Sequence, residues 1–135
     1  MAAPRYMLDT NVVSDLIRNP TGKVAARIFR LGDDSVCVSI VVAAELRYGC
    51  AKRGSPRLLS LVEGALARMP VLPLDLPADA EYASIRTELE TAGKPIGPND
   101  LLIAAHAYAL RMPLVTADIA EFSRVRGLHV ENWRE

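Results

Sequence analysis

Arg5-Tyr6-Met7-Leu8-Asp9-Thr10-Asn11 is the stretch that decides the fold, because a short apolar strand runs directly into an acid and two helix-starting residues. The first strand of an α/β sheet often lies centrally, and ligands bind beyond the carboxyl ends of the strands. Asp9 is therefore expected at a ligand-binding edge, and Thr10 or Asn11 is expected to cap the helix that follows. A role for Asp9 as a turn or cap residue alone is the alternative.

Length, charge and cysteine content limit the class of protein. The 135 residues predict one domain, 1–135, with a substantial core, and the 16 basic and 16 acidic side chains give no formal net charge. Any nucleic-acid binding must therefore use a local patch. Cys37 and Cys50 match no metal or redox spacing, so we expect core thiols in a reducing cytosol. The start of the chain does not resemble a signal peptide, and the longest apolar run, Val36 to Ala44, is too short to span a membrane. We expect a soluble cytoplasmic protein.

Strand and helix patterns alternate along the chain. Strands are predicted at 6–8, 36–40, 71–74, 114–116 and 128–130, and helices at 12–17, 22–31 (capped by Thr21), 41–52, 56–69, 79–92, 98–110 and 119–122. The strand at 36–40 lacks polar alternation, as expected for a parallel strand covered on both faces. Pro73 places the third strand at a sheet edge. The pattern predicts a three-layer α/β/α fold, with a mostly parallel sheet of four or five strands and helices on both faces.

Glu45 lies on a helix face that is otherwise largely apolar. Its neighbours at helical spacing include Val41 and Val42. A carboxylate on such a face is costly to bury unless it is paired or binds a metal. The alternative is a boundary glutamate that reaches solvent or pairs with Arg47 or Lys52.

Asp100 and Asp118 repeat the placement of an acid beside apolar segments. Asp100 lies in the first turn of a helix that begins at Pro98, where a carboxylate also favours the helix dipole by about 0.3–1 kcal/mol. Asp118 follows an apolar strand, as Asp9 does. Its alternative role is to cap the next helical turn, with Glu121 completing a capping box.

Four converging acids would need a countercharge. Two unit charges about 4 Å apart repel by about 4 kcal/mol at an effective dielectric near 20, and no lysine or arginine stands beside these acids within their motifs. Oxygen ligands suit Mg²⁺ or Mn²⁺ rather than zinc. His106 is expected at a helix surface or boundary and His129 on the solvent side of a strand, so neither is expected to bind a metal.

The acids are carried by four segments: Tyr6-Met7-Leu8-Asp9-Thr10-Asn11, Ser39-Ile40-Val41-Val42-Ala43-Ala44-Glu45-Leu46, Gly97-Pro98-Asn99-Asp100-Leu101-Leu102-Ile103-Ala104-Ala105, and Val115-Thr116-Ala117-Asp118 through Glu121-Phe122. As an ordered set they resemble the successive motifs of the PIN domain, and more narrowly those of VapC-type toxins. The ending Glu131-Asn132-Trp133 is also similar to those toxins.

This resemblance implies a metal-dependent endoribonuclease that acts on tRNA, rRNA or mRNA. It implies that the ligands of Mg²⁺ or Mn²⁺ are Asp9, Glu45, Asp100 and Asp118, although the fourth position varies between Asp and Asn in such toxins. It further implies a VapB-type antitoxin that blocks the site, and a homodimer.

Such a site has a defined chemistry. Carboxylate-bound Mg²⁺, as one ion or a pair about 3.5–4 Å apart, lowers the pKa of a bound water and stabilises an in-line displacement, which leaves 5′-phosphate and 3′-hydroxyl ends. Residues expected to orient ligands or waters, or simply to cap helices, are Thr10, Asn11, Ser39 and Thr116. Candidates for contacts to RNA phosphates, each with a solvated surface charge as its alternative role, are Arg47, Lys52, Arg53, Arg57 and Lys94.

Two other classes of protein remain open at this point. A phosphoryl-transfer enzyme or a receiver domain would form a covalent aspartyl-phosphate at Asp9. A dehalogenase-type site would place an acid where this chain has Asn11, and a receiver would need an acid pair at the first strand and a lysine after the last. The other class is a PIN-fold binding module without catalysis.

Overall fold

A computed structural model describes residues 4–135. Within this part of the chain, five short strands form one sheet in the order β3-β2-β1-β4-β5, and every neighbouring pair is parallel. The strands are β1 (Tyr6–Leu8), β2 (Val36–Ser39), β3 (Val71–Leu72), β4 (Leu114–Val115) and β5 (Val130–Glu131). The first strand is therefore central, as predicted. Asp9 directly follows its carboxyl end and so lies in the middle of the carboxyl edge of the sheet.

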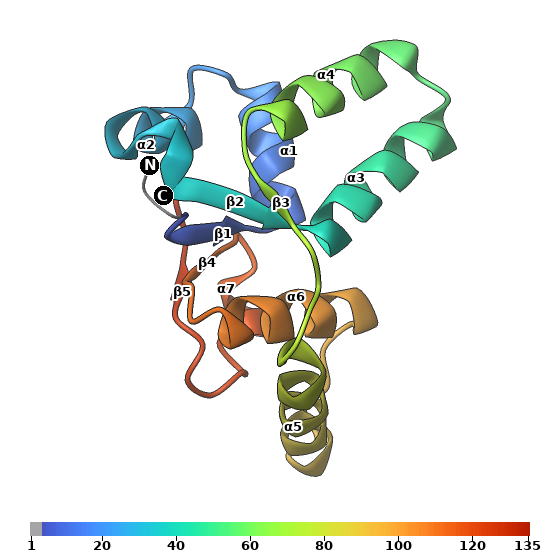
Figure 1. The fold of residues 1–135 in the computed structure, drawn as a ribbon, viewed down its shortest axis with the longest axis vertical. Helices are drawn as coiled ribbons and strands as arrows, with labels where there is room; N and C mark the ends of the chain where they lie inside the picture. Colours follow the sequence, from blue (N-terminus) through green and yellow to red (C-terminus); the bar gives the residue numbers. More distant parts are fainter. Residues whose placement is uncertain (1–3) are drawn as a thin grey trace.

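Helices cover both faces of the sheet (Figure 1). In the described residues they are α1 (Thr10–Arg18), α2 (Lys23–Leu31), α3 (Ile40–Arg53), α4 (Pro56–Ala67), α5 (Ala78–Thr91), α6 (Pro98–Ala109) and α7 (Ile119–Phe122), with a short 3₁₀ helix at Asp33–Ser35. In Figure 1, α1 to α4 lie above the sheet and α5 to α7 lie below it. The predicted three-layer α/β/α fold is confirmed.

The two central strands form the middle of the core. Met7, Leu8 and all four residues of β2 are buried, which agrees with the lack of polar alternation in these strands. Strand β3 lies beside β2 at the edge of the sheet, as predicted. Pro73 follows it directly, at a position where the missing N–H removes no bond from the ladder.

Two predicted helix caps are wrong. The residue before α2 is Gly22 rather than Thr21, and no side chain caps this helix. Helix α1 is capped by Asp9, whose Oδ1 accepts a hydrogen bond from the backbone N–H of Thr10 at 2.8 Å. The side chains of Thr10 and Asn11 are therefore free to contact other elements, and this freedom shapes the site described below.

The prediction that His106 lies at a helix surface or boundary is also wrong. Its side chain is buried, at 2% exposure, and its Nδ1 lies 2.7 Å from the hydroxyl of Ser39. That hydroxyl caps α3 by accepting from the N–H of Val41, so its own proton is available to the imidazole. Burial lowers the pKa of His106, and a hydrogen bond to the backbone of Pro73 acts against this decrease. His106 is thus a neutral core residue that joins α6 to β2.

The cysteines agree with their sequence patterns. Cys37 and Cys50 are buried free thiols, and burial raises the pKa of Cys37 to about 12, so this thiol is unreactive. His129 is exposed, as predicted, and contacts Glu131. No helix within residues 4–135 is long and apolar enough to cross a membrane.

Candidate active site

Asp9 is the most enclosed acid of the site. It is 4% exposed and lies where β1 ends. Its Oδ1 accepts from the N–H of Thr10, and its Oδ2 accepts from the hydroxyl of Thr116 at 2.8 Å and the amide of Asn11 at 3.3 Å. Burial raises the pKa of Asp9; the bonds from Thr116 and Thr10 oppose this rise, and the charges of Glu45 and Asp118 add to it. Asp9 is therefore both the cap of α1 and a carboxylate that is held rigidly beside other acids.

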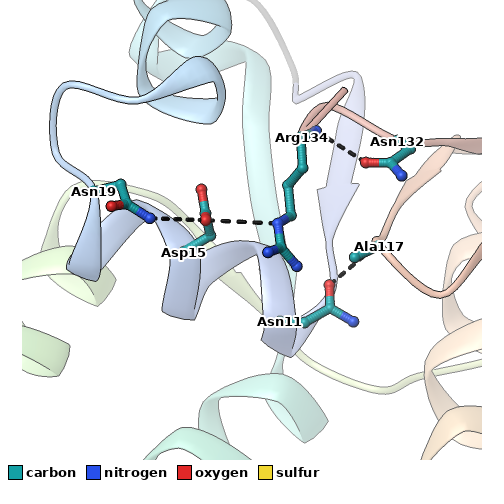
Figure 2. A network of polar contacts seen from close by, with 6 residues as sticks. All are labelled: Asn11, Asp15, Asn19, Ala117, Asn132 and Arg134. Carbon is teal, nitrogen blue, oxygen red and sulfur yellow. Dashed lines mark hydrogen bonds and ion pairs between the residues drawn. The ribbon is translucent and has the colours of Figure 1, made fainter.

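Asn11 connects this carboxylate to the loop after β4. Its side-chain oxygen accepts from the N–H of Ala117 at 3.0 Å (Figure 2), while its amide also lies 3.4 Å from the hydroxyl of Thr116. The same hydroxyl accepts from the N–H of Asp118 at 3.0 Å. One hydrogen-bond network thus fixes the ends of β1 and β4 relative to each other.

Glu45 reaches the same edge from α3. The hydroxyl of Thr10 donates to its Oε1 at 2.6 Å, and the amide of Asn99 donates to its Oε2 at 3.3 Å. Arg47 instead pairs with Glu63 at 3.3 Å, so the alternative pairing of Glu45 with Arg47 is wrong. Asn99 was not singled out from the sequence, although it adjoins the acid of the α6 motif.

Asp100 lies in the first turn of α6 and is half-buried. Its pKa is raised to about 7, first by burial, then by a hydrogen bond and charge from Glu121, and further by the charges of Asp9 and Glu45. These charge interactions show that acids from β1, α3 and α6 lie within electrostatic reach of one another. The hydrogen bond from Asn99 to Glu45 at 3.3 Å agrees with this, because it brings the start of α6 next to Glu45.

Asp118 caps α7, which is the alternative role predicted for it. Asp118 is exposed and accepts from the N–H of Glu121 at 3.3 Å at the start of α7. Glu121 does not complete a capping box, because its Oε1 accepts from the N–H of Gly97 at 3.1 Å, at the start of α6. Sequence patterns assigned Glu121 to a cap. Its spacing from Asp118 gives no sign of the contact with Gly97.

We call Asp9, Glu45, Asp100, Asp118 and Glu121 together the acidic edge. None of them forms an ion pair with a lysine or arginine within residues 4–135. In the same residues, no three His, Cys, Asp or Glu side chains form a ready-made metal cluster. An oxygen-only donor set nevertheless suits Mg²⁺ or Mn²⁺, since such ions keep several waters and need only one or two direct carboxylates.

Most of the predicted RNA-contacting cations have no acidic partner in the described residues. Lys52, Arg53, Arg57 and Lys94 are exposed and outside the ion pairs found there, whereas Arg47 is engaged with Glu63. Only Arg53 among them lines a cavity that also contains Thr10 and Glu45.

Comparisons with known proteins agree with this arrangement. The PIN domain family profile matches residues 6–128. The chain is 40% identical over 130 residues to "tRNA(fMet)-specific endonuclease VapC" of Shigella flexneri, covering 96% of this chain and 98% of that protein. It is 38% identical to "Ribonuclease VapC2" of Haemophilus influenzae, again covering 96% and 98%.

Solved structures give the same result. The structure of DNA-bound VapBC from Salmonella typhimurium matches with a TM-score of 0.89 and 36% identity, covering 96% of this chain and 98% of that chain. VapBC2 of Rickettsia felis, bound to a promoter DNA fragment, matches with a TM-score of 0.86 and 35% identity, covering 95% and 98%. The order of the acidic motifs, the sheet that gathers them and these relatives lead to one conclusion: the chain belongs to the PIN domain family and, within it, to the VapC ribonucleases.

Proposed function

We propose that residues 1–135 act as a single PIN domain, a Mg²⁺- or Mn²⁺-dependent endoribonuclease toxin that a VapB-type antitoxin inhibits in the cytoplasm. The observation that carries this proposal is the acidic edge, where carboxylates from four elements influence one another and form no ion pair with a lysine or arginine of the described residues. A polyanionic substrate would be repelled by such a site. A divalent cation removes that conflict and gives the acids a common ligand.

The side chains divide into two groups in this proposal. Asp9, Glu45 and Asp100 hold the cation, with Asp118 and Glu121 completing the negative charge around it. Thr116 and Asn11 fix the orientation of Asp9, while Thr10 and Asn99 fix that of Glu45. When bound, the cation supplies a water of lowered pKa and stabilises charge on the phosphodiester. His106 is not available as a base, because it is buried in the core and hydrogen-bonded to Ser39.

We propose tRNA as the substrate class. The support is the 40% identical relative that is named for cleavage of tRNA(fMet). Ribosomal and messenger RNA fragments are the comparison substrates, since the name of a relative does not carry its cleavage site to this chain.

The activity is expected in purified protein freed of any antitoxin. With Mg²⁺ or Mn²⁺ it should cut tRNA internally, leaving 5′-phosphate and 3′-hydroxyl ends, and EDTA should stop the reaction. Ca²⁺ should bind yet support little turnover, because its looser coordination positions water poorly. Denaturing gels and end-group labelling measure the outcome. Cleavage that continues unchanged in EDTA would contradict the metal-dependent proposal.

The antitoxin needs a docking surface, and we propose the large groove, a cavity of about 850 Å³ between α1, α2 and α4. Phe29 lies in it with 87% of its surface exposed, and Leu61 on α4 is also exposed. Exposed apolar side chains that gather in one groove are typical of a protein-binding site. Relatives of this chain have been solved as VapBC complexes, which supports a VapB-type partner as its occupant.

Filling the large groove should weaken antitoxin binding. Gly64 lines it, and a Cβ at this position would meet no atom within 4 Å, so Gly64→Phe should fold normally. We expect at least about a tenfold loss of affinity, since interface cores tolerate misfitting side chains poorly. Gly49→Phe, at an equally open position on α3 outside this groove, is the control. Titration calorimetry with the antitoxin measures both; wild-type affinity in Gly64→Phe would contradict docking in the large groove.

We also propose that two copies associate through the outer face of α3. Ile40, Ala44 and Tyr48 follow one another at helical spacing and are all exposed, which leaves an apolar stripe on that helix. Light scattering of the purified protein tests this association.

A further inference from the structure

We propose that a second cavity, beside the acidic edge, binds the nucleotide adjoining the phosphodiester that is cut. This side cavity has a volume of about 320 Å³ and lies between α1, α3 and α4. The inference rests on the proposed ribonuclease function and adds the path that the substrate strand follows away from the acids.

The side cavity is continuous with the acidic edge. Thr10 and Glu45, which hydrogen-bond to each other at 2.6 Å, both line it. A nucleotide in the cavity would therefore have its neighbouring phosphate at the carboxylates. The volume is near the lower end of the range found for small-molecule sites, about 300–1,000 Å³, which suits one nucleotide rather than a folded segment.

The lining matches the two chemical parts of a nucleotide. Arg18 and Arg53 line the cavity, and neither forms an ion pair in the part of the chain that the structure describes. Apolar side chains such as Ile17, Leu46 and Val62 line it as well. The phosphate of a nucleotide would bind to the arginines. Its base would pack against the apolar side chains and stack on the guanidinium planes.

Position beside the acidic edge distinguishes this cavity from the large groove, since arginines line both. Because the acidic edge repels a phosphate backbone, the arginines next to it, which form no ion pair within residues 4–135, supply the attraction that an anionic substrate needs. Arg18 was not singled out from the sequence, since it closes a different helix from the Glu45 motif. Both arginines lie in the last turn of a helix, where a positive charge is also stabilised. If Arg18 and Arg53 only stabilised the ends of their helices, substituting them would alter the stability of the protein and leave RNA binding unchanged.

Two matched pairs of variants test the inference, each in an Asp9→Asn background so that the RNA stays uncut. Gly49→Phe fills the side cavity, where a Cβ at Gly49 would meet no atom within 4 Å, and Gly64→Phe fills the large groove in the same way. Arg53→Gln removes a cation from the side cavity, and Arg30→Gln removes one from the large groove. Each pair changes size or charge equally at two different places.

Binding is measured by fluorescence anisotropy with a labelled single-stranded RNA of about 12 nucleotides in Mg²⁺, which spans more than one phosphate on each side of a bound nucleotide. Gly49→Phe and Arg53→Gln should each weaken binding at least about tenfold, the equivalent of one charge-assisted contact. The salt dependence of log K should fall by about 0.7 for Arg53→Gln. Gly64→Phe and Arg30→Gln should bind as the background protein does. Circular dichroism melts check that all variants fold.

Equal RNA binding by Gly49→Phe and Gly64→Phe would overturn the inference. So would a loss of antitoxin binding, with RNA binding intact, in Gly49→Phe, because the cavity would then serve a protein partner. These outcomes differ from failure of the proposed function. If the wild type cuts no RNA with any metal, the nuclease proposal fails while the binding assay still reports on the cavity. If the wild type cuts RNA and Gly49→Phe in the Asp9→Asn background binds RNA as tightly as the background protein does, only the inference fails.

Discussion

Asp9→Asn is expected to lower the rate of RNA cleavage by about a thousandfold or more while the protein keeps its fold. Substitution of residues that only orient metal ligands already costs about 10- to 100-fold, so loss of a ligand should cost more. The amide keeps the size of the carboxylate, and its oxygen can still accept the N–H of Thr10 that starts α1. Cleavage rate and thermal unfolding are measured on the same preparations.

The matched control is Asp15→Asn, the same change at a buried acid within α1. Asp15 lies away from the acidic edge, where it accepts from Asn19 at 3.0 Å and contacts Arg134 at 3.6 Å (Figure 2). This variant should cleave RNA like the wild type and unfold at a somewhat lower temperature.

Expression of the wild type without antitoxin should arrest bacterial growth, and Asp9→Asn should relieve the arrest. Equal cleavage by the wild type and Asp9→Asn would assign the activity to a contaminant.

Metal-free protein is expected to lose stability as the pH rises from about 4 to about 7, and Asp100→Asn should remove much of this loss. The pKa of Asp100 in the folded protein is about 7, above its ordinary value of 3.8, because of burial and the acids around it. The folded state then holds this proton more tightly than the unfolded state, so stability falls as the proton is lost and the full destabilisation is present above pH 7.

Denaturant unfolding in EDTA at pH 5 and pH 8 measures this effect. At pH 8, Asp100→Asn should be at least as stable as the wild type, since it removes a carboxylate that its neighbours repel. Mg²⁺ at one hundred times its dissociation constant should stabilise the wild type by about 2.7 kcal/mol through linkage, and Asp100→Asn by much less. If Asp100→Asn unfolds at pH 8, the carboxylate has a structural role and its assignment as a ligand fails.

The family assignment decides among the classes that the sequence left open. Strand-end acids such as Asp9 occur in phosphoryl-transfer enzymes and receivers as well, so this feature alone does not separate them. The whole-length match to VapC ribonucleases supports the nuclease interpretation instead.

The sequence by itself determined the layers of the fold and the position of the first acid. A strand without polar alternation, such as Val36–Ser39, is expected between two layers of helices, and an acid that ends a central parallel strand lies at the carboxyl edge of the sheet. Both conclusions depend on local periodicity and on general rules of sheet topology, so they need no knowledge of long-range contacts.

Only the tertiary structure showed which side chains contact one another between different elements of the fold. Glu121 suited a capping box by its spacing, yet it reaches the N–H of Gly97 across 24 residues of chain, and Thr10 contacts Glu45 across 35. His106 lies in a largely apolar helix, but only the packing of α6 against β2 shows that its partner is Ser39. Hydrogen-bond partners far apart in sequence depend on how helices pack, and helical spacing describes only contacts within one helix.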